Sequence, residues 1–244
     1  NASKMYHDNT PVENIKDFKL KAGDFVLQKE NIFEKYEKIG EIIGEGTYGK
    51  IVKMKNLATN DIRAVKVIPK KTIRSGVTFD DIINEIDILR GLDHPNIIKI
   101  FEFFMDEENF YLVTEFCEEG DLFDHLQDLD LDENIVCQII FEILTAVNYL
   151  NQRNIFHGDL KLENILIDRK TTVNRNSHIY KHIDIKLIDF GCSKIFLKNE
   201  KYNEIIGTLH YCSPEVLKME YNYKCDVWST GVLMYMMITG RYPI

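Results

Sequence analysis

Three glycines near the start of the sequence have a spacing that suits phosphate binding. Gly44, Gly46 and Gly49 form a GxGxxG pattern, and such glycines let backbone N–H groups approach phosphate oxygens closely. The pattern alone is weak, because ordinary turns and dinucleotide-binding fingerprints also contain it. The fingerprint requires a helix directly after the glycines, whereas here a strand-like segment follows and no helix is expected before Thr78. We therefore favour a phosphate-binding loop between two strands.

A lysine and a glutamate follow this loop at suggestive positions. Lys66 ends the strand-like run Ala64-Val65-Lys66, and Glu85 lies 19 residues later in a helical pattern. A strand lysine can hold phosphates as a point charge, and a glutamate on a packed helix can hold that lysine in place. Either residue alone would more often be a surface charge. Their joint placement after the glycines indicates a phosphate site.

The sequence resembles the eukaryotic protein kinase family at residues 157–164 (HGDLKLEN) and 189–191 (DFG). Seven motifs occur in the family's order, the last two being residues 213–215 (SPE) and 226–228 (DVW). The resemblance covers residues 36–244. It implies an α+β fold of two lobes, with a β-rich N-lobe that contains one long helix and a mainly helical C-lobe.

The resemblance also implies a role for each polar residue of the later motifs. Asp159 would accept the proton of the substrate hydroxyl, and Lys161 would stabilise the γ-phosphoryl charge. Asn164 and Asp189 would be the Mg²⁺ ligands, so ATP and Mg²⁺ are the expected cofactors. The Asp-Leu-Lys spacing and Thr208 are typical of the serine/threonine branch, so protein Ser and Thr hydroxyls are the expected acceptors. The residues implied to be catalytic are Lys66, Glu85, Asp159, Lys161 and Thr208.

A nucleotide pocket between the lobes is a further implication of the resemblance. Ile43, Ala64 and Leu166 should enclose the adenine, and backbone groups of Glu115 and Cys117 should bind its edge. The full set expected to contact the nucleotide is Ile43, Gly44, Glu45, Gly46, Gly49, Ile51, Ala64, Lys66, Thr114, Glu115, Cys117, Asp121, Leu166 and Asp189.

Two acidic residues near the expected cleft bear on substrate choice. Asp121 is placed to meet the ribose or a basic substrate side chain, and Glu163 is a second candidate for such a side chain. The formal net charge of the chain is −9. We therefore hypothesise a preference for Arg or Lys near the phosphorylated residue.

Gly158 departs from the family pattern, which usually has arginine before the catalytic aspartate. That arginine commonly pairs with a phosphorylated residue of the activation segment. Three residues before Gly207, where many relatives carry the phosphorylated threonine, this chain has Glu204. Both changes lead us to expect activity without phosphorylation of the activation segment.

Two alternatives to an active protein kinase remain open. A pseudokinase would bind a nucleotide or partner without turnover, but such modules generally lack a residue of the set that here is complete: Lys66, Asp159, Asn164 and Asp189. An enzyme that phosphorylates a small molecule is disfavoured by residues 213–215, because this motif positions peptides in the family. Cys192 follows the DFG motif and is either a reactive thiol or, as we favour, an inert one.

The N-lobe elements are predicted from hydrophobic patterns. From Tyr36 onward, short β-rich segments broken by turns predict an antiparallel sheet. A capping-box signal at Thr78 and Asp81 begins a helix that ends near Gly91. Two further strands are predicted over residues 97–104 and 110–115.

The C-lobe patterns are mainly helical. A helix over residues 135–150 carries an apolar stripe that includes Leu144 and leaves Glu142 and Asn148 outside. Residues 227–238 are apolar on almost every side, which predicts a helix buried in the middle of the lobe. Residues 168–185 should form an extended surface hairpin.

The resemblance divides the chain into an N-terminal extension, residues 1–35, and a kinase domain, residues 36–244. Within the domain, the N-lobe should span 36–114, the hinge 115–120 and the C-lobe 121–244. Relatives continue with several more helices after the buried helix, so we expect the C-terminal helices to be absent here.

Residues 89–98 and 206–217 look most like the calcium/calmodulin-dependent group, especially the calcium-dependent protein kinases of plants and protists. That subgroup normally adds EF-hands, and no EF-hand loop occurs in this sequence. A regulatory calcium-binding region outside this chain is the partner that the resemblance suggests.

Composition limits the remaining classes. The chain has 244 residues, 45% of them hydrophobic, enough for one large domain or two lobes. Asp and Glu residues outnumber Lys and Arg residues by 39 to 30, which argues against nucleic-acid binding. The longest apolar run, residues 232–238, is far shorter than a transmembrane helix. Five scattered cysteines indicate an intracellular protein, and within the cell we expect it in the cytoplasm.

Overall fold

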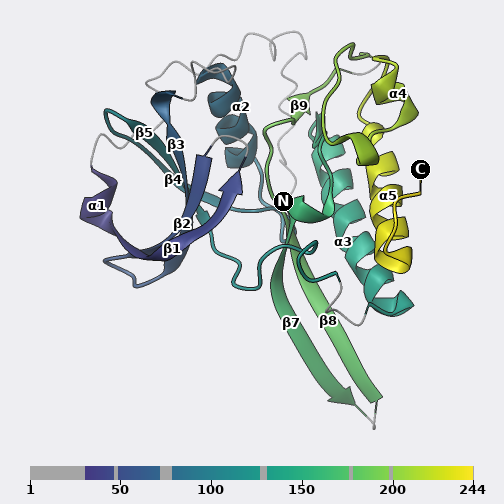
Figure 1. Cartoon of the computed structure of the whole chain (residues 1–244), viewed down its shortest axis with the longest axis horizontal. Helices are drawn as coiled ribbons and strands as arrows, with labels where there is room; N and C mark the ends of the chain where they lie inside the picture. The colour runs from purple at the N-terminus through teal and green to yellow at the C-terminus, as the bar shows by residue number, and fades with distance from the viewer. Residues whose placement is uncertain are drawn as a thin grey trace, which may run out of the picture.

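The computed structural model shows two lobes (Figure 1). It describes residues 31–46, 49–71, 79–126, 131–175, 178–197 and 200–243. The first lobe is built on a β-sheet and the second is mainly helical, which confirms the predicted α+β class. Of the predicted extension over residues 1–35, residues 1–30 lie outside the described residues, and residues 32–35 form a short helix. Thr78 of the capping box and Thr47 and Tyr48 of the glycine loop also lie outside the described residues.

The N-lobe sheet has five strands in the order β1-β2-β3-β5-β4, all antiparallel. Ala64 lies opposite Thr114, and Lys66 lies between Ile51 and Leu112. This register aligns the expected nucleotide-contacting residues across neighbouring strands. The elements are α1 (Ile32–Lys35), β1 (Tyr36–Gly46), β2 (Gly49–Asn56), β3 (Ile62–Pro69), α2 (Phe79–Arg90), β4 (Ile100–Met105) and β5 (Asn109–Glu115).

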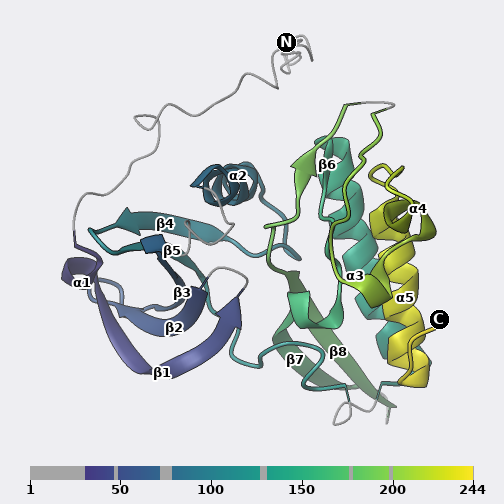
Figure 2. The same cartoon turned by 45° about the horizontal axis from the view of Figure 1, so that its top comes forward.

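Helix α2 covers one face of this sheet (Figure 2). Its buried Ile82 and Ile86 pack against Ile68, Phe103 and Leu112, because helical residues four apart share a face. The alternate residues of the strands form a second apolar cluster on the opposite face of the sheet. Packing of α2 therefore orients the helix that carries Glu85.

The C-lobe is built around two long helices that pack together, α3 and α5. A hairpin of β7 and β8 projects beyond them (Figure 1), as predicted for residues 168–185. The elements are α3 (Glu133–Gln152), β6 (Ile155–Phe156), η3 (Leu162–Asn164), β7 (Ile165–Arg175), β8 (His178–Leu187), β9 (Lys194–Ile195), η4 (Leu209–Tyr211), α4 (Pro214–Leu217) and α5 (Cys225–Thr239).

Two predictions about α3 were wrong. Glu142, expected on the polar side, is buried, because Asn96 and the backbone of Ile185 hydrogen-bond its carboxylate. Leu144, expected in the apolar stripe, is 41% exposed. Hydrophobic spacing alone cannot show that a polar side chain has buried partners on a distant strand. Asn148 is exposed as predicted.

Helix α3 is also the one helix in the described part of the chain that could cross a membrane by length and composition. Its apolar side chains nevertheless form the core of the C-lobe, and Gln138 bonds the backbone of β8. These contacts are those of a core helix.

Helix α5 is less buried than predicted. Val232, Leu233 and Met236 are buried, whereas Val227 and Ile238 are 51% and 60% exposed. The helix packs on one side against α3 and η4, and the described residues leave its other side exposed. The strand predicted over 97–104 begins only at Ile100.

Candidate active site

Lys66 and Glu85 form a buried ion pair between the sheet and α2. The Lys66 Nζ lies 2.9 Å from Oε1 and 3.1 Å from Oε2 of Glu85. Burial by itself lowers the pKa of Lys66, but the charges of Glu85 and Asp189 outweigh it and raise the pKa above its ordinary value. The lysine therefore stays charged, as a phosphate ligand requires.

Asp159 is the centre of a hydrogen-bonded cluster in the catalytic loop. Its Oδ1 accepts the Thr208 hydroxyl at 2.8 Å, and its Oδ2 lies 3.1 Å from the Lys161 Nζ. The Lys161 ammonium also donates to Thr208 Oγ1 at 3.0 Å. A carboxylate, an ammonium and a hydroxyl thus meet, although Thr208 lies 49 residues from Asp159.

Asn164 and Asp189 fit the role of metal ligands. The Asn164 amide nitrogen donates to Asp159 O and Oδ2 at 2.8 and 3.2 Å, so its amide oxygen takes no part in these two bonds. Asp189 lies close enough to Lys66 to raise the pKa of the lysine. Its φ of 61° is a left-handed conformation that few non-glycine residues adopt. Hard oxygen donors of this kind are those that Mg²⁺ prefers.

The catalytic loop is anchored to α5 by Asp226. The carboxylate of this residue is buried and accepts the backbone N–H groups of His157 and Gly158 at 2.7 and 2.9 Å. The ring of His157 packs on Phe190, with centroids 4.8 Å apart. The side chain of Asp226, which α5 carries, thus positions the backbone that precedes Asp159.

The expected nucleotide residues come from both lobes. Asp121 forms a β-bridge with Leu166, which joins the hinge to β7. The side chain of Glu115 is held by Lys186 at 3.0 Å, and the Thr114 hydroxyl faces Ala64 O at 3.4 Å. Ile43 is 47% exposed at the edge of the sheet.

Burial raises the pKa of the Cys117 thiol to about 12, so this hinge cysteine stays protonated.

Gly49 is paired with Gly46, and a Cβ atom at position 49 would overlap the carbonyl oxygen of Val67. Only glycine therefore fits at the third position of the pattern, because β2 approaches β3 closely there.

Lys194 is a residue that the sequence analysis missed. It lies on β9 and forms an ion pair with Glu204. Its position five residues after Asp189 has no charge pattern that would have revealed this partner. This ion pair joins β9, which follows the DFG motif, to the activation segment.

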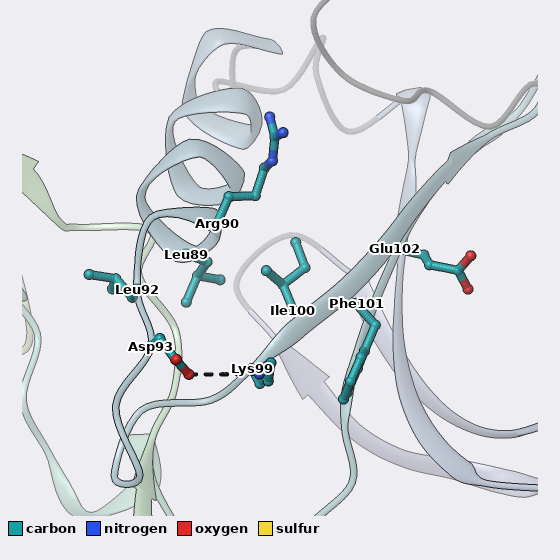
Figure 3. A pocket seen from close by; sticks show the side chains of 8 residues that line it. All are labelled: Leu89, Arg90, Leu92, Asp93, Lys99, Ile100, Phe101 and Glu102. Carbon is teal, nitrogen blue, oxygen red and sulfur yellow. Dashed lines mark ion pairs between the residues drawn. The ribbon is translucent and has the colours of Figure 1, made fainter.

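One pocket lies away from this site. It has a volume of about 370 Å³ and is found where α2 ends and β4 begins (Figure 3). Asp93 and Lys99 form an ion pair at its rim. None of the catalytic or metal-ligating side chains lines it, so it is separate from the active site.

The described fold and cluster define a protein kinase. The family model for the protein kinase domain matches residues 36–244, and the chain belongs to this family, whose members use ATP and Mg²⁺ for phosphoryl transfer. The chain carries a serine/threonine kinase domain similar to those of calcium-dependent protein kinases. The domain boundaries within it remain a prediction.

Curated relatives are named in the same terms. Calcium-dependent protein kinase 4 of Plasmodium falciparum (isolate 3D7) is 36% identical over 95% of this chain and 43% of its own length. Calcium-dependent protein kinase 3 of Plasmodium yoelii yoelii is 39% identical, over 93% and 40%. Calcium-dependent protein kinase 14 of Arabidopsis thaliana is 34% identical, over 87% and 38%. The chain therefore spans less than half the length of these relatives.

Proposed function

We propose that this chain transfers the γ-phosphoryl group of MgATP to Ser and Thr hydroxyls of proteins. The observation that carries the proposal is the cluster of Asp159, Lys161 and Thr208, because its carboxylate accepts from a hydroxyl and its ammonium donates to that same oxygen. A substrate hydroxyl needs a similar carboxylate to take its proton.

Each residue of the site has a role in this reaction. Asp159 orients the acceptor hydroxyl and takes its proton, and Lys161 stabilises charge on the transferred group. Lys66, held by Glu85, binds the phosphates. Asn164 and Asp189 would hold Mg²⁺, which neutralises phosphate charge when it is bound.

An assay with a basic Ser/Thr peptide tests this function against the pseudokinase alternative. We expect Asp159→Asn to lower phosphate transfer from ATP by roughly 10²- to 10⁴-fold while nucleotide binding is retained. The same peptide with Ala at the acceptor position is the control. Equal transfer by the original chain and by Asp159→Asn would support the alternative of a binding module.

We also propose that the kinase does not need phosphorylation of its activation segment. Glu204 already carries the negative charge that pairs with Lys194, and Gly158 has no side chain to bind a phosphate. Phosphatase treatment should therefore leave the transfer rate unchanged within twofold. A complete loss of activity after treatment would refute the proposal.

A preference for basic substrates is the third part of the proposal. Glu163 is partly exposed in the catalytic loop, and its Oε2 has no hydrogen-bond partner among the described residues, so its carboxylate is placed to pair with a cationic side chain of a substrate. Peptide arrays should show selection for Arg or Lys near the acceptor. Glu163→Gln should weaken that selection without changing the rate on a neutral peptide, and an array with no basic preference would contradict the proposal.

Regulation and location complete the proposal. The names of the relatives support a calcium-binding regulatory region outside this chain, so the chain alone should be equally active with and without Ca²⁺.

Five free cysteines support an intracellular, cytoplasmic location. Microscopy of the tagged full-length protein would test the location.

A further inference from the structure

A second cluster of ligand-type side chains lies where β8 packs on α3, away from the active site. Glu142 of α3 and His182 and Asp184 of β8 each place one carboxylate or imidazole atom within 4.8 Å of the others. His182 Nε2 lies 2.9 Å from Asp184 Oδ1 and 3.7 Å from Glu142 Oε1. None of the three belongs to a kinase motif.

Regular secondary structure holds these side chains. His182 and Asp184 are two residues apart on a strand and so share a face. Gln138, one helical turn before Glu142, bonds both backbone groups of Ile183, at 3.2 Å to its N–H and 2.8 Å to its carbonyl. These two bonds fix the strand against the helix, so the cluster is preorganised.

The carboxylate of Glu142 lacks a permanent cation. Its side chain is 11% exposed, its Oε2 accepts N–H groups from Asn96 and Ile185 at 2.7 and 3.0 Å, and its Oε1 accepts one from the amide of Gln138. Among the described residues, the only cationic group recorded within 4.0 Å of it is the imidazole of His182. A buried carboxylate is costly unless it is paired or bound to a metal.

We propose that Glu142, His182 and Asp184 bind one divalent transition-metal ion, with Zn²⁺ as the best match. An imidazole favours Zn²⁺ over Mg²⁺ or Ca²⁺, which prefer oxygen ligands. Zinc binds nitrogen and oxygen ligands in a tetrahedron at about 2.0 to 2.2 Å, so its ligand atoms lie about 3.3 to 3.6 Å apart. The observed 2.9 and 3.7 Å lie on either side of that range, and the third pair of ligand atoms lies within 4.8 Å, so small side-chain movements would bring the three groups onto one ion.

The ion would take the place of the hydrogen bond between His182 Nε2 and Asp184 Oδ1, and water would complete its coordination. Because two ligands come from β8 and one from α3, the bound ion would fasten the projecting hairpin to the body of the C-lobe. The active-site residues play no part in this inference, so it stands whether or not the proposed kinase activity is found.

Zinc titration of the metal-free chain against a coloured zinc indicator tests the proposal. We expect one site of micromolar affinity or better that His182→Ala weakens at least tenfold, whereas His125→Ala, which removes a histidine outside the cluster, leaves it unchanged. Asp184→Asn is a second variant in case His182→Ala folds poorly by circular dichroism.

Hydrogen exchange provides a readout that does not depend on the indicator. Zn²⁺ should slow exchange of amides in β7 and β8 in the original chain and in His125→Ala, but not in His182→Ala. The proposal is overturned if the original chain and both cluster variants bind zinc equally, because the ion then binds elsewhere, for example at a cysteine. Failure to saturate the original chain would overturn it as well.

Discussion

The catalytic loop and the residue after the DFG motif meet backbone to backbone at Gly158 and Cys192. A Cβ atom on Gly158 would lie 2.8 Å from the carbonyl oxygen of Cys192. Gly207 approaches from the activation segment, where a Cβ atom would lie 2.5 Å from the Gly158 carbonyl oxygen. Two glycines thus allow three segments to touch beside Asp159.

Gly158→Ala should destabilise the protein. The φ angle of Gly158 is 83°, which strains an L side chain, and the added methyl also meets the Cys192 carbonyl. We expect a loss of roughly 2 to 4 kcal/mol in the free energy of unfolding, measured with urea. The control is Gly231→Ala in α5, where the new Cβ meets no atom within 4 Å. This substitution should stabilise the helix by about 0.5 to 1 kcal/mol. Similar values for both variants would contradict this explanation.

Thr208→Val should lower kcat while the KM for ATP changes little. Valine keeps the shape of threonine but removes the hydroxyl that bridges Asp159 and Lys161. A hydrogen bond to a charged group contributes about 1.5 to 3 kcal/mol, so we expect kcat to fall roughly 10- to 100-fold. Thr208→Ser retains the hydroxyl and should recover most of the rate. If the serine variant is as slow as the valine variant, the hydroxyl is not the cause.

Glu204→Ala should reduce activity several-fold without lowering the urea midpoint. Its ion pair with Lys194 is exposed, and exposed pairs contribute little to stability. The pair nevertheless connects β9 to the activation segment, so its loss should let that segment move. Asp93→Ala is the control, because Asp93 forms an exposed pair with Lys99 outside the activation segment. An equal effect of both variants on kcat would refute the special role of Glu204.

Cys192 should react slowly with iodoacetamide. Burial raises the pKa of its thiol, although a backbone hydrogen bond from Gly207 acts in the opposite direction. A raised pKa means less thiolate at a given pH, so the alkylation rate should still climb between about pH 8 and 9.5. Mass spectrometry should find Cys137, which is exposed, modified first at pH 7.5. Faster modification of Cys192 would show an activated thiol.

Much of the active site was predictable from the sequence, because its residues lie in short motifs. The spacing from Lys66 to Glu85 and the β-rich and helical patterns around them predicted the ion pair that the fold forms. Local periodicity likewise predicted α2 and α3, and a polar stretch longer than most relatives have predicted the hairpin of β7 and β8. These features depend on residue types and neighbouring positions, which a sequence displays directly.

Tertiary structure decided what depends on partners far apart in the chain. Glu142 is buried because Asn96 and the strand β8 supply its hydrogen bonds, and a helical pattern cannot contain that information. Lys194 finds Glu204 only when β9 and the activation segment fold together. The close packing at Gly158 is of the same kind, because three separate segments create it. Sequence therefore determined which chemical groups are present, and long-range packing determined which of them meet.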